Sequence, residues 1–203
     1  MFVKICGVTN LDDALQAVEA GADAVGMVFA ESPRRIEPAT GESIVRSLPP
    51  ETLSVAVFRN QPLDEIREIL RVTRARGAQI HGPRPGDVRA LRGAVSFVIE
   101  AIAATARVGE RLERSDADLV LVDSGSPGSG EAFDWSLLDG AARERLVLAG
   151  GLHPGNVSDA ITLVRPHGVD VASGVEAAPG RKDPDKVRRF VDRARAALSE
   201  AGA

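Results

Sequence analysis

Phe2-Val3-Lys4-Ile5-Cys6-Gly7 opens the chain as a short, mostly apolar run that a glycine stops. Its carboxyl end carries Cys6, the only cysteine of the sequence. After it, Thr9 or Asn10 can cap a helix that ends near Gly21. The stretch therefore predicts one strand followed by one helix. In parallel α/β proteins, functional side chains gather at the carboxyl ends of such strands.

The same strand-then-helix pattern recurs along the 203 residues. Short runs rich in Val, Ile, Leu or Ala, bounded by turn-forming residues, predict the strands Phe2–Cys6, Ala24–Phe29, Ser54–Phe58, Ala78–His81, Ser96–Ile102, Asp118–Asp123, Leu146–Ala149 and Val169–Ala172. Several of these runs lack clean alternation, as expected for strands that are covered on both faces. Further helices are predicted from Pro38, from Pro62, and at Pro85–Leu91, Ala106–Arg114, Trp135–Ala141, Pro154–Val164 and Pro184–Leu198.

Eight such units predict an α/β fold, a single-domain (βα)8 TIM barrel that spans residues 1–203. The competing fold is an open, doubly wound sheet. None of the predicted strands is followed by the G-x-G-x-x-G turn of a dinucleotide-binding fold, which favours the barrel.

The composition limits the compartment and the partners. A lone cysteine excludes an internal disulfide and is consistent with a reducing compartment. The sequence shows no signal-peptide pattern and no apolar run near the roughly 20 residues of a membrane span, so we expect a cytoplasmic protein without membrane contacts. A net charge of −4 and the absence of tyrosine argue against nucleic-acid binding. The sequence leaves the oligomeric state open, a homodimer included.

Cys6 is the first candidate for chemistry. It is either a buried small side chain or a general base or nucleophile. Lys4 precedes it by two residues and so points to the same side of the strand, where its charge can lower the pKa of the thiol. A lysine inside a barrel is costly unless it has a partner.

Asp123 ends the sixth predicted strand. It is either a turn cap or a general acid whose pKa burial raises towards the working range. The polar stretch at residues 124–131 follows it, and its glycines, Gly128 and Gly130 among them, can form a flap over Asp123.

Anion-binding residues are expected at other strand ends. Gly150-Gly151 and Ser173-Gly174 follow the last two strands, which is where barrels place phosphate sites built from backbone N–H groups. Arg34 and Arg35 follow the second strand, and a guanidinium suits a carboxylate or a phosphate. His81 is more often a packed strand-end histidine than a catalyst. The three histidines are scattered, so we expect no metal site and no cofactor.

In order and spacing, the motifs together resemble the phosphoribosylanthranilate isomerase family, the Amadori-rearrangement enzymes of tryptophan biosynthesis. The resemblance covers nearly the whole chain. It rests on Lys-Ile-Cys-Gly at 4–7, Ser32-Pro33-Arg34, Gln79-Ile80-His81-Gly82, Asp123, Phe133-Asp134-Trp135, Leu148-Ala149-Gly150-Gly151-Leu152 and the run from Val169 to Glu176.

The resemblance implies an aldose–ketose isomerase that converts N-(5-phosphoribosyl)anthranilate to 1-(2-carboxyphenylamino)-1-deoxyribulose 5-phosphate without a cofactor. It implies that Cys6 is the general base and Asp123 the general acid. It also implies that Arg34, with Arg35 as the alternative, meets the anthranilate carboxylate, and that the final glycine turns hold the phosphate of this small-molecule substrate.

Two kinds of rival function remain. One is another phosphate-binding barrel enzyme, either a sugar-phosphate epimerase or an indole-glycerol-phosphate synthase-like lyase. Metal-dependent epimerases need histidine and acidic ligands that converge on the barrel mouth, where the sequence supplies only His81. The other is a non-catalytic barrel that binds a phosphorylated ligand without turnover.

Overall fold

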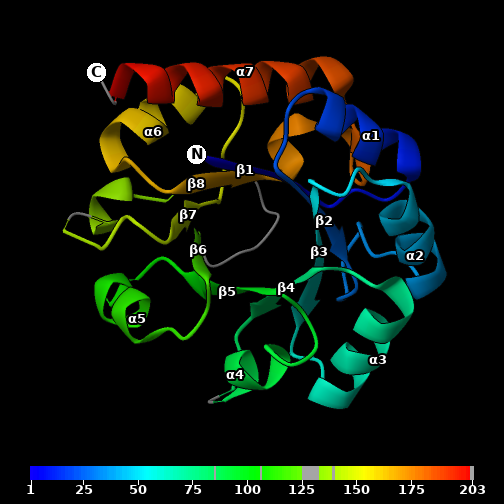
Figure 1. The fold of residues 1–203 in the computed structure, drawn as a ribbon. Helices are drawn as coiled ribbons and strands as arrows, with labels where there is room; N and C mark the ends of the chain where they lie inside the picture. The colour runs from blue at the N-terminus through cyan, green and yellow to red at the C-terminus, as the bar shows by residue number, and fades with distance from the viewer. Residues whose placement is uncertain (85, 106, 125–132, 139, 202–203) are drawn as a thin grey trace.

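The computed structural model describes residues 1–84, 86–105, 107–124, 133–138 and 140–201. Eight parallel strands pair in sequence order and close into a barrel (Figure 1). They are β1 (Phe2–Cys6), β2 (Ala24–Val28), β3 (Leu53–Arg59), β4 (Gly77–His81), β5 (Phe97–Ala103), β6 (Leu119–Asp123), β7 (Leu146–Leu148) and β8 (Gly168–Val171). Pairing of β1 with both β2 and β8 closes the ring. The single-domain (βα)8 barrel is thus confirmed.

Helices surround the barrel (Figure 1). They are α1 (Leu11–Glu19), α2 (Pro38–Ser47), α3 (Leu63–Thr73), α4 (Asp87–Leu91), α5 (Val108–Arg114), α6 (Val157–Val164) and α7 (Pro184–Ala201). The Asn10 side chain accepts a hydrogen bond from the Asp13 N–H at 2.8 Å and so caps α1, as expected. Within the described part of the chain, no helix combines the length and the apolar character that a membrane span requires.

The predicted helix at Trp135–Ala141 is wrong. Among the described residues between β6 and β7, the structure has a 3-10 turn, η1 (Trp135–Leu138), in place of an α-helix. The Asp134 carboxylate accepts the Ser136 N–H at 3.0 Å and starts the turn, and Gly140 follows with a φ of +75°. A residue in the left-handed conformation, as Gly140 is here, typically ends a helix. The segment from Trp135 to Gly140 is therefore too short to form an α-helix.

Two short elements after β8 have no counterpart in the predicted elements. A 3-10 turn, η2 (Ser173–Val175), leads into a small antiparallel hairpin of β9 (Glu176–Ala178) and β10 (Arg181–Lys182). The Thr9 hydroxyl donates to the Gly180 carbonyl at 2.6 Å and so joins this hairpin to the loop after β1. The hairpin therefore lies next to the end of the strand that carries Cys6.

Two apolar layers stabilise the barrel. The larger one lies between strands and helices and includes Met27, Phe58 and Phe190. The smaller one fills the interior with side chains of alternate strand positions: Cys6, Ala24, Val55, Val57, Ile99, Ala101, Leu119, Leu121, Val147 and Ala149. Because Lys4 and Cys6 are two residues apart on β1, both face this interior.

Candidate active site

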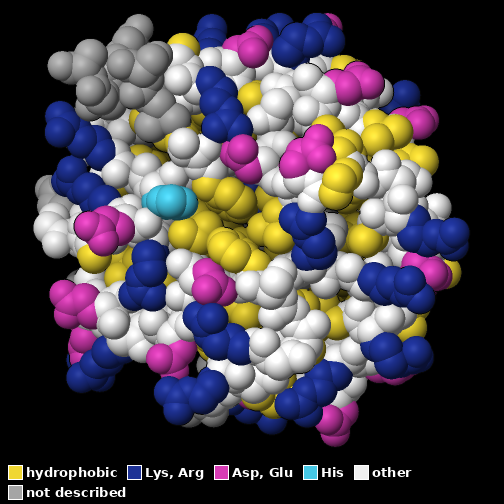
Figure 2. Space-filling model, viewed as in Figure 1, with side chains coloured by type: hydrophobic (Ala, Val, Ile, Leu, Met, Phe, Trp, Pro, Cys, Tyr) yellow, Lys and Arg dark blue, Asp and Glu magenta, His cyan; other side chains and the backbone are white. Residues whose placement is uncertain are grey.

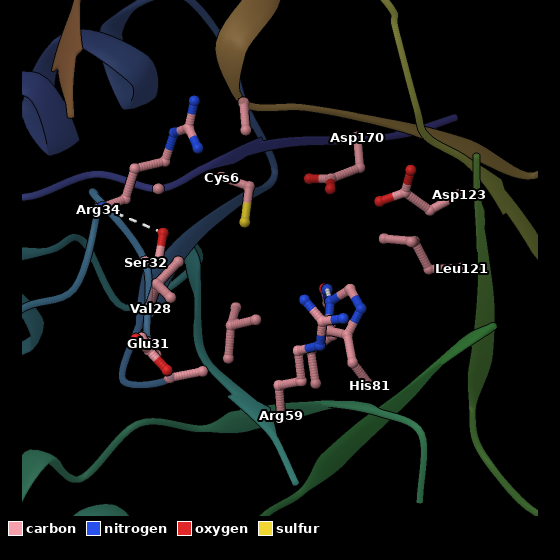
Figure 3. Close-up of a pocket in the computed structure, with 15 residues that line it drawn as sticks. Cys6, Val28, Glu31, Ser32, Arg34, Arg59, His81, Leu121, Asp123 and Asp170 are labelled. Atoms are coloured by element: carbon pink, nitrogen blue, oxygen red, sulfur yellow. Dashed lines mark hydrogen bonds between the residues drawn. The ribbon is translucent and has the colours of Figure 1, made fainter. Parts of the chain in front are cut away.

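A pocket opens at the carboxyl ends of the barrel strands and collects the residues on which the predicted chemistry depends. Cys6 from β1, Arg34 from the loop after β2, His81 from β4 and Asp123 from β6 all line it. In Figure 3, Cys6 points into the pocket and Asp123 enters from the other side. Figure 2 shows apolar side chains at the centre of one face, with acidic and basic side chains around them.

A buried ion pair lies directly below Cys6. Lys4 is fully buried, and its Nζ is 2.8 Å from Asp170 Oδ1 on β8. Burial alone would lower the pKa of Lys4, but Asp170 and Cys6 outweigh it, so the pKa of Lys4 is raised and the side chain remains charged. Asp170 is thus the partner that a lysine inside the barrel requires.

The thiol of Cys6 is a weak acid in this setting. Burial raises its pKa above the ordinary value, the charge of Lys4 opposes the rise, and Asp170 adds to it. Lys4 therefore acts on Cys6 in the expected direction, but burial is the stronger effect. The free protein holds Cys6 mainly as the thiol, with Lys4 as the nearest group that favours the thiolate.

Gly26 makes room for this pair. It occupies the β2 position beside Cys6 in the strand register. A Cβ at residue 26 would lie 2.8 Å from Cys6 Sγ and 3.1 Å from Lys4 Cε. Any larger residue would displace one of these side chains, because such separations are shorter than ordinary van der Waals contact.

Asp123 is buried at the opposite wall. Its Oδ1 accepts the Ser124 N–H at 2.6 Å and the Ser124 hydroxyl at 3.1 Å. Burial raises the pKa of Asp123, and the hydrogen bonds from Ser124 offset only part of that rise. A carboxyl group in this setting keeps its proton to higher pH than usual, as a general acid requires.

The two glycine turns lie beside Asp123. Gly150, Gly151 and Ser173 line a second, adjoining pocket that Asp123 and Asp170 share with the first. Gly150 and Gly151 have φ values of +77° and +66°, which L side chains rarely adopt. The turns are therefore positioned to present backbone N–H groups to an anion next to the pocket.

Gly174 is required by close packing of the two turns. A Cβ there would lie 1.9 Å from the Leu152 carbonyl oxygen. Only glycine lets the turn after β8 approach the turn after β7 so closely. Gly128 and Gly130 lie outside the described residues. So does the flap expected at residues 124–131, apart from Ser124.

The structure separates the two candidate arginines. Arg34 is buried, lines the pocket and donates from Nε and Nη2 to the two carboxylate oxygens of Glu176, at 2.7 and 2.8 Å. Arg35 is exposed and is absent from the pocket lining. Arg34 is therefore the arginine that a ligand in the pocket can reach.

His81 is neutral in the pocket. Burial, then the charges of Lys4 and Arg59, lower its pKa to about 4. Its Nε2 lies 2.9 Å from the side-chain nitrogen of Gln79. The interpretation as a packed strand-end histidine fits these contacts, and the pocket position lets the neutral ring face a ligand as well.

Three polar residues of the site were assigned no role from the sequence. Asp170 could have been found, because an inward-facing Lys4 demands an acidic partner on a neighbouring strand. Arg59, at the end of β3, lines the main pocket and a further pocket beside it that Asp123 and His81 also line. Glu176 belongs to a hairpin that no apolar pattern indicates. Among the described residues, no cluster of three or more His, Cys, Asp or Glu side chains is arranged to hold a metal ion.

Comparison with known proteins gives consistent matches. The family model described as N-(5'phosphoribosyl)anthranilate (PRA) isomerase matches residues 3–193. The N-(5'-phosphoribosyl)anthranilate isomerase of Desulforudis audaxviator is 45% identical over 204 residues, which cover 97% of this chain and 98% of the relative. That of Thermotoga maritima is 43% identical over 201 residues, covering 95% and 98%.

Solved structures agree with these relatives. The phosphoribosyl anthranilate isomerase of Thermus thermophilus superposes with a TM-score of 0.88 at 36% identity, covering 97% of this chain and 99% of the other. A second isomerase structure, in complex with reduced 1-(o-carboxyphenylamino)-1-deoxyribulose 5-phosphate, gives a TM-score of 0.84 at 40% identity with the same coverage. A third, described as monomers of a dimeric isomerase from Thermotoga maritima, gives 0.84 at 39% identity, again covering 97% and 99%.

Proposed function

The chain belongs to the N-(5'-phosphoribosyl)anthranilate isomerase family, and from this premise we propose that Cys6 and Asp123 are its general base and general acid. The reaction converts N-(5-phosphoribosyl)anthranilate to 1-(2-carboxyphenylamino)-1-deoxyribulose 5-phosphate in tryptophan biosynthesis. The observation that supports the assignment is the convergence of a thiol and a carboxyl group, from β1 and β6, on one pocket.

Asp123 acts first in the proposed mechanism. Its carboxyl group gives a proton to the ring oxygen of the ribose, the bond between C1 and that oxygen breaks, and the nitrogen lone pair forms a Schiff base at C1. Burial favours the protonated carboxyl that this step needs. The freed hydroxyl on C4 remains near Asp123, which now carries the negative charge.

Cys6 acts second. Its thiolate removes the proton from C2, and the electron pair moves through C1 to nitrogen to give an enolamine. Tautomerisation then places a proton on C1 and leaves the ketone at C2, so that no atom is gained or lost overall. Lys4 supports this step because its charge favours the thiolate that burial disfavours.

The substrate carries two anionic groups, and the pocket offers a place for each. The phosphate is assigned to the turns at Gly150-Gly151 and Ser173-Gly174, which adjoin the side of Asp123. The anthranilate carboxylate is assigned to Arg34. This assignment places the ribose between Cys6 and Asp123. A phosphorylated ligand in the related complex supports the same class of small-molecule partner.

The proposal extends to the setting of the enzyme. We include a cytoplasmic location, because a thiol that acts as a base must stay reduced. We also include a homodimer, since a related isomerase is described as dimeric, and sedimentation equilibrium of the purified protein tests this point.

Turnover of the purified protein tests the proposed roles. The fluorescence of N-(5-phosphoribosyl)anthranilate is followed as it disappears, for the wild type and for Cys6→Ser and Asp123→Asn. Each variant should lose a factor of about 10²–10⁴ in kcat, the usual contribution of one positioned acid or base, while circular dichroism remains unchanged. A variant with near wild-type kcat contradicts the role of that residue. A wild type that binds phosphate without turnover would support the non-catalytic barrel instead.

A further inference from the structure

Glu176 is the centre of a buried cluster of charges that the acid–base steps do not use. Its Oε1 accepts from Arg34 Nε at 2.7 Å and from Lys182 Nζ at 3.0 Å, and its Oε2 accepts from Arg34 Nη2 at 2.8 Å. The side chain of Arg34 is 11% exposed, that of Glu176 is 5% exposed and that of Lys182 is 0% exposed. The cluster is therefore fixed by charge-assisted hydrogen bonds inside the protein.

The contact uses one particular edge of the Arg34 guanidinium. Nε and Nη2 together form the side edge, and Glu176 occupies it with both oxygens. The end edge, made by Nη1 and the second N–H of Nη2, is a separate pair of parallel donors. A second carboxylate can therefore bind the end edge bidentately without displacing Glu176.

Lys182 keeps the cluster positive. Burial alone would raise the pKa of Glu176, but the hydrogen bonds from Arg34 and the charge of Lys182 lower it below the ordinary value, so the carboxylate is ionised. Burial lowers the pKa of Lys182, and the charge of Glu176 opposes that effect. With Lys182 protonated, one carboxylate between two cations leaves a net charge of +1. Arg34 consequently still attracts an anion, although one of its edges is already paired.

The cluster also lies at the junction of two parts of the site. Glu176 begins β9 directly after the turn Ser173–Val175. On the other side, the stem of Arg34 packs over Gly7, where a Cβ would lie 2.5 Å from Arg34 Cδ. Glu176 thus links the arginine loop to the turn assigned to phosphate, next to the residue that follows Cys6.

We propose that Glu176 is a positioning residue that holds the side edge of Arg34, so that the end edge receives the substrate carboxylate and sets the preference for a substrate that carries one. This inference rests on the proposed function. Lys182 assists by leaving the cluster with the positive charge that a carboxylate needs.

A comparison of two substrates distinguishes the positioning role of Glu176 from a general effect on the stability of the protein. N-(5-phosphoribosyl)anthranilate is compared with N-(5-phosphoribosyl)aniline, which lacks the carboxylate, and product is quantified by chromatography. Glu176→Gln should raise KM for the anthranilate substrate about tenfold, or about 1.4 kcal/mol, with little change in kcat. It should leave the aniline substrate unchanged. Added to Arg34→Ala, it should cause no further loss.

A matched control is available on the outer wall of the barrel. Glu100 also accepts two side-chain hydrogen bonds, from Arg111 at 3.1 Å and Ser115 at 2.6 Å, and does not line the main pocket. Glu100→Gln should preserve the preference for the carboxylate. If Glu176→Gln does not fold, Glu176→Asp keeps the charge but shortens its reach, and it should show a smaller loss confined to the anthranilate substrate.

The outcomes separate the levels of the proposal. A wild type that turns over neither substrate contradicts the proposed function itself. A wild type that treats both substrates alike contradicts the role of Arg34 and, with it, that of Glu176. The third outcome is a wild type that prefers the anthranilate substrate. If the Glu176 variants then keep that preference, or lose activity equally on both substrates, only the role of Glu176 is overturned.

Discussion

Replacing Lys4 by methionine tests how the barrel supplies a thiolate. The substitution keeps the length and apolar stem of the side chain and removes the charge that lies 2.8 Å from Asp170 Oδ1. In the wild type this charge lowers the pKa of Cys6 against the effect of burial. Without Lys4, burial and Asp170 both raise the pKa of the thiol, and the charge of Lys182, the smallest of the effects on it, still lowers it. The pKa of the thiol therefore rises further.

The expected pH profile follows from the order of the two pKa values. The ordinary values are 9.0 for Cys6 and 3.8 for Asp123, and burial raises both, so the thiol remains the weaker acid. In the proposed mechanism the active form has a thiolate and a protonated carboxyl, which makes it the minor form. Its fraction is constant between the two pKa values. It falls below the pKa of Asp123 and above that of Cys6.

Lys4→Met should therefore lower the plateau of kcat/KM, tenfold for each unit by which the thiol pKa rises more than the pKa of Asp123. The alkaline limb should move to higher pH. The acidic limb, which reports Asp123, should move to higher pH by less, because the Lys4 charge also lowers the pKa of Asp123 but is the smallest of the effects on it. The assay is steady-state turnover from about pH 5 to about pH 10 at constant ionic strength. An unchanged plateau would refute the action of Lys4 on the thiol, and an acidic limb that moves further than the alkaline limb would refute the order of the two groups.

The same substitution has a cost in stability. Removing one partner of a buried ion pair destabilises by roughly 3–5 kcal/mol. For a chain of this size that corresponds to a decrease in Tm of about 6–20 °C. The double variant Lys4→Met/Asp170→Asn removes both charges and should recover most of the Tm. Its plateau should lie between those of the wild type and the single variant, because Lys4 affects the thiol pKa more than Asp170 does.

Three further substitutions test other contacts of the site. Gly26→Ala places a Cβ 2.8 Å from Cys6 Sγ, and it should reduce kcat and destabilise by about 1–3 kcal/mol, as measured by turnover and thermal unfolding. Gly174→Ala places a Cβ 1.9 Å from the Leu152 carbonyl oxygen, and it should weaken inhibition by inorganic phosphate about tenfold. Arg59→Met should lower kcat/KM and its salt dependence, and it should raise the pKa of His81 in NMR titration because the Arg59 charge lowers it.

Each of these variants has a control in the chain. Gly93 has open space where its Cβ would lie, so Gly93→Ala should leave turnover unchanged. Arg35 is exposed and outside the pocket, so Arg35→Met should not alter the salt dependence of kcat/KM. The predicted contact of Gly26 with Cys6 would be contradicted by full activity in Gly26→Ala. The packing at Gly174 would be contradicted by wild-type phosphate inhibition in Gly174→Ala. The effect of Arg59 on His81 would be contradicted by an unchanged His81 pKa in Arg59→Met.

The barrel could be predicted from the sequence because its strands are covered on both faces. Runs such as Leu119-Val120-Leu121-Val122 are apolar throughout and end at a polar or turn-forming residue, so each predicted boundary lies within one residue of the observed strand. The segment after β6 could not be predicted in this way. Trp135, Leu137 and Leu138 imitate a helical apolar face, but Gly140 ends the element after one turn.

The candidate site was predictable where chemistry lies at a strand end. Cys6 and Asp123 follow directly from that rule. The contacts between distant segments were not predictable, since the pairing of Arg34 with Glu176 joins residues 142 positions apart. The net shift of the Cys6 pKa was hidden as well. The sequence shows Lys4 beside the thiol, but it does not show how completely the barrel buries both.

Cys6 and Asp123 are assigned as base and acid on opposite sides of one bound sugar, and a crystal structure with reduced 1-(o-carboxyphenylamino)-1-deoxyribulose 5-phosphate tests this most directly. The sulfur should lie about 3–3.5 Å from C2, and the Asp123 carboxyl should lie within hydrogen-bond distance of the hydroxyl on C4. A ligand whose C2 is separated from the sulfur by other side chains, or whose C4 hydroxyl faces away from Asp123, would contradict the assignment.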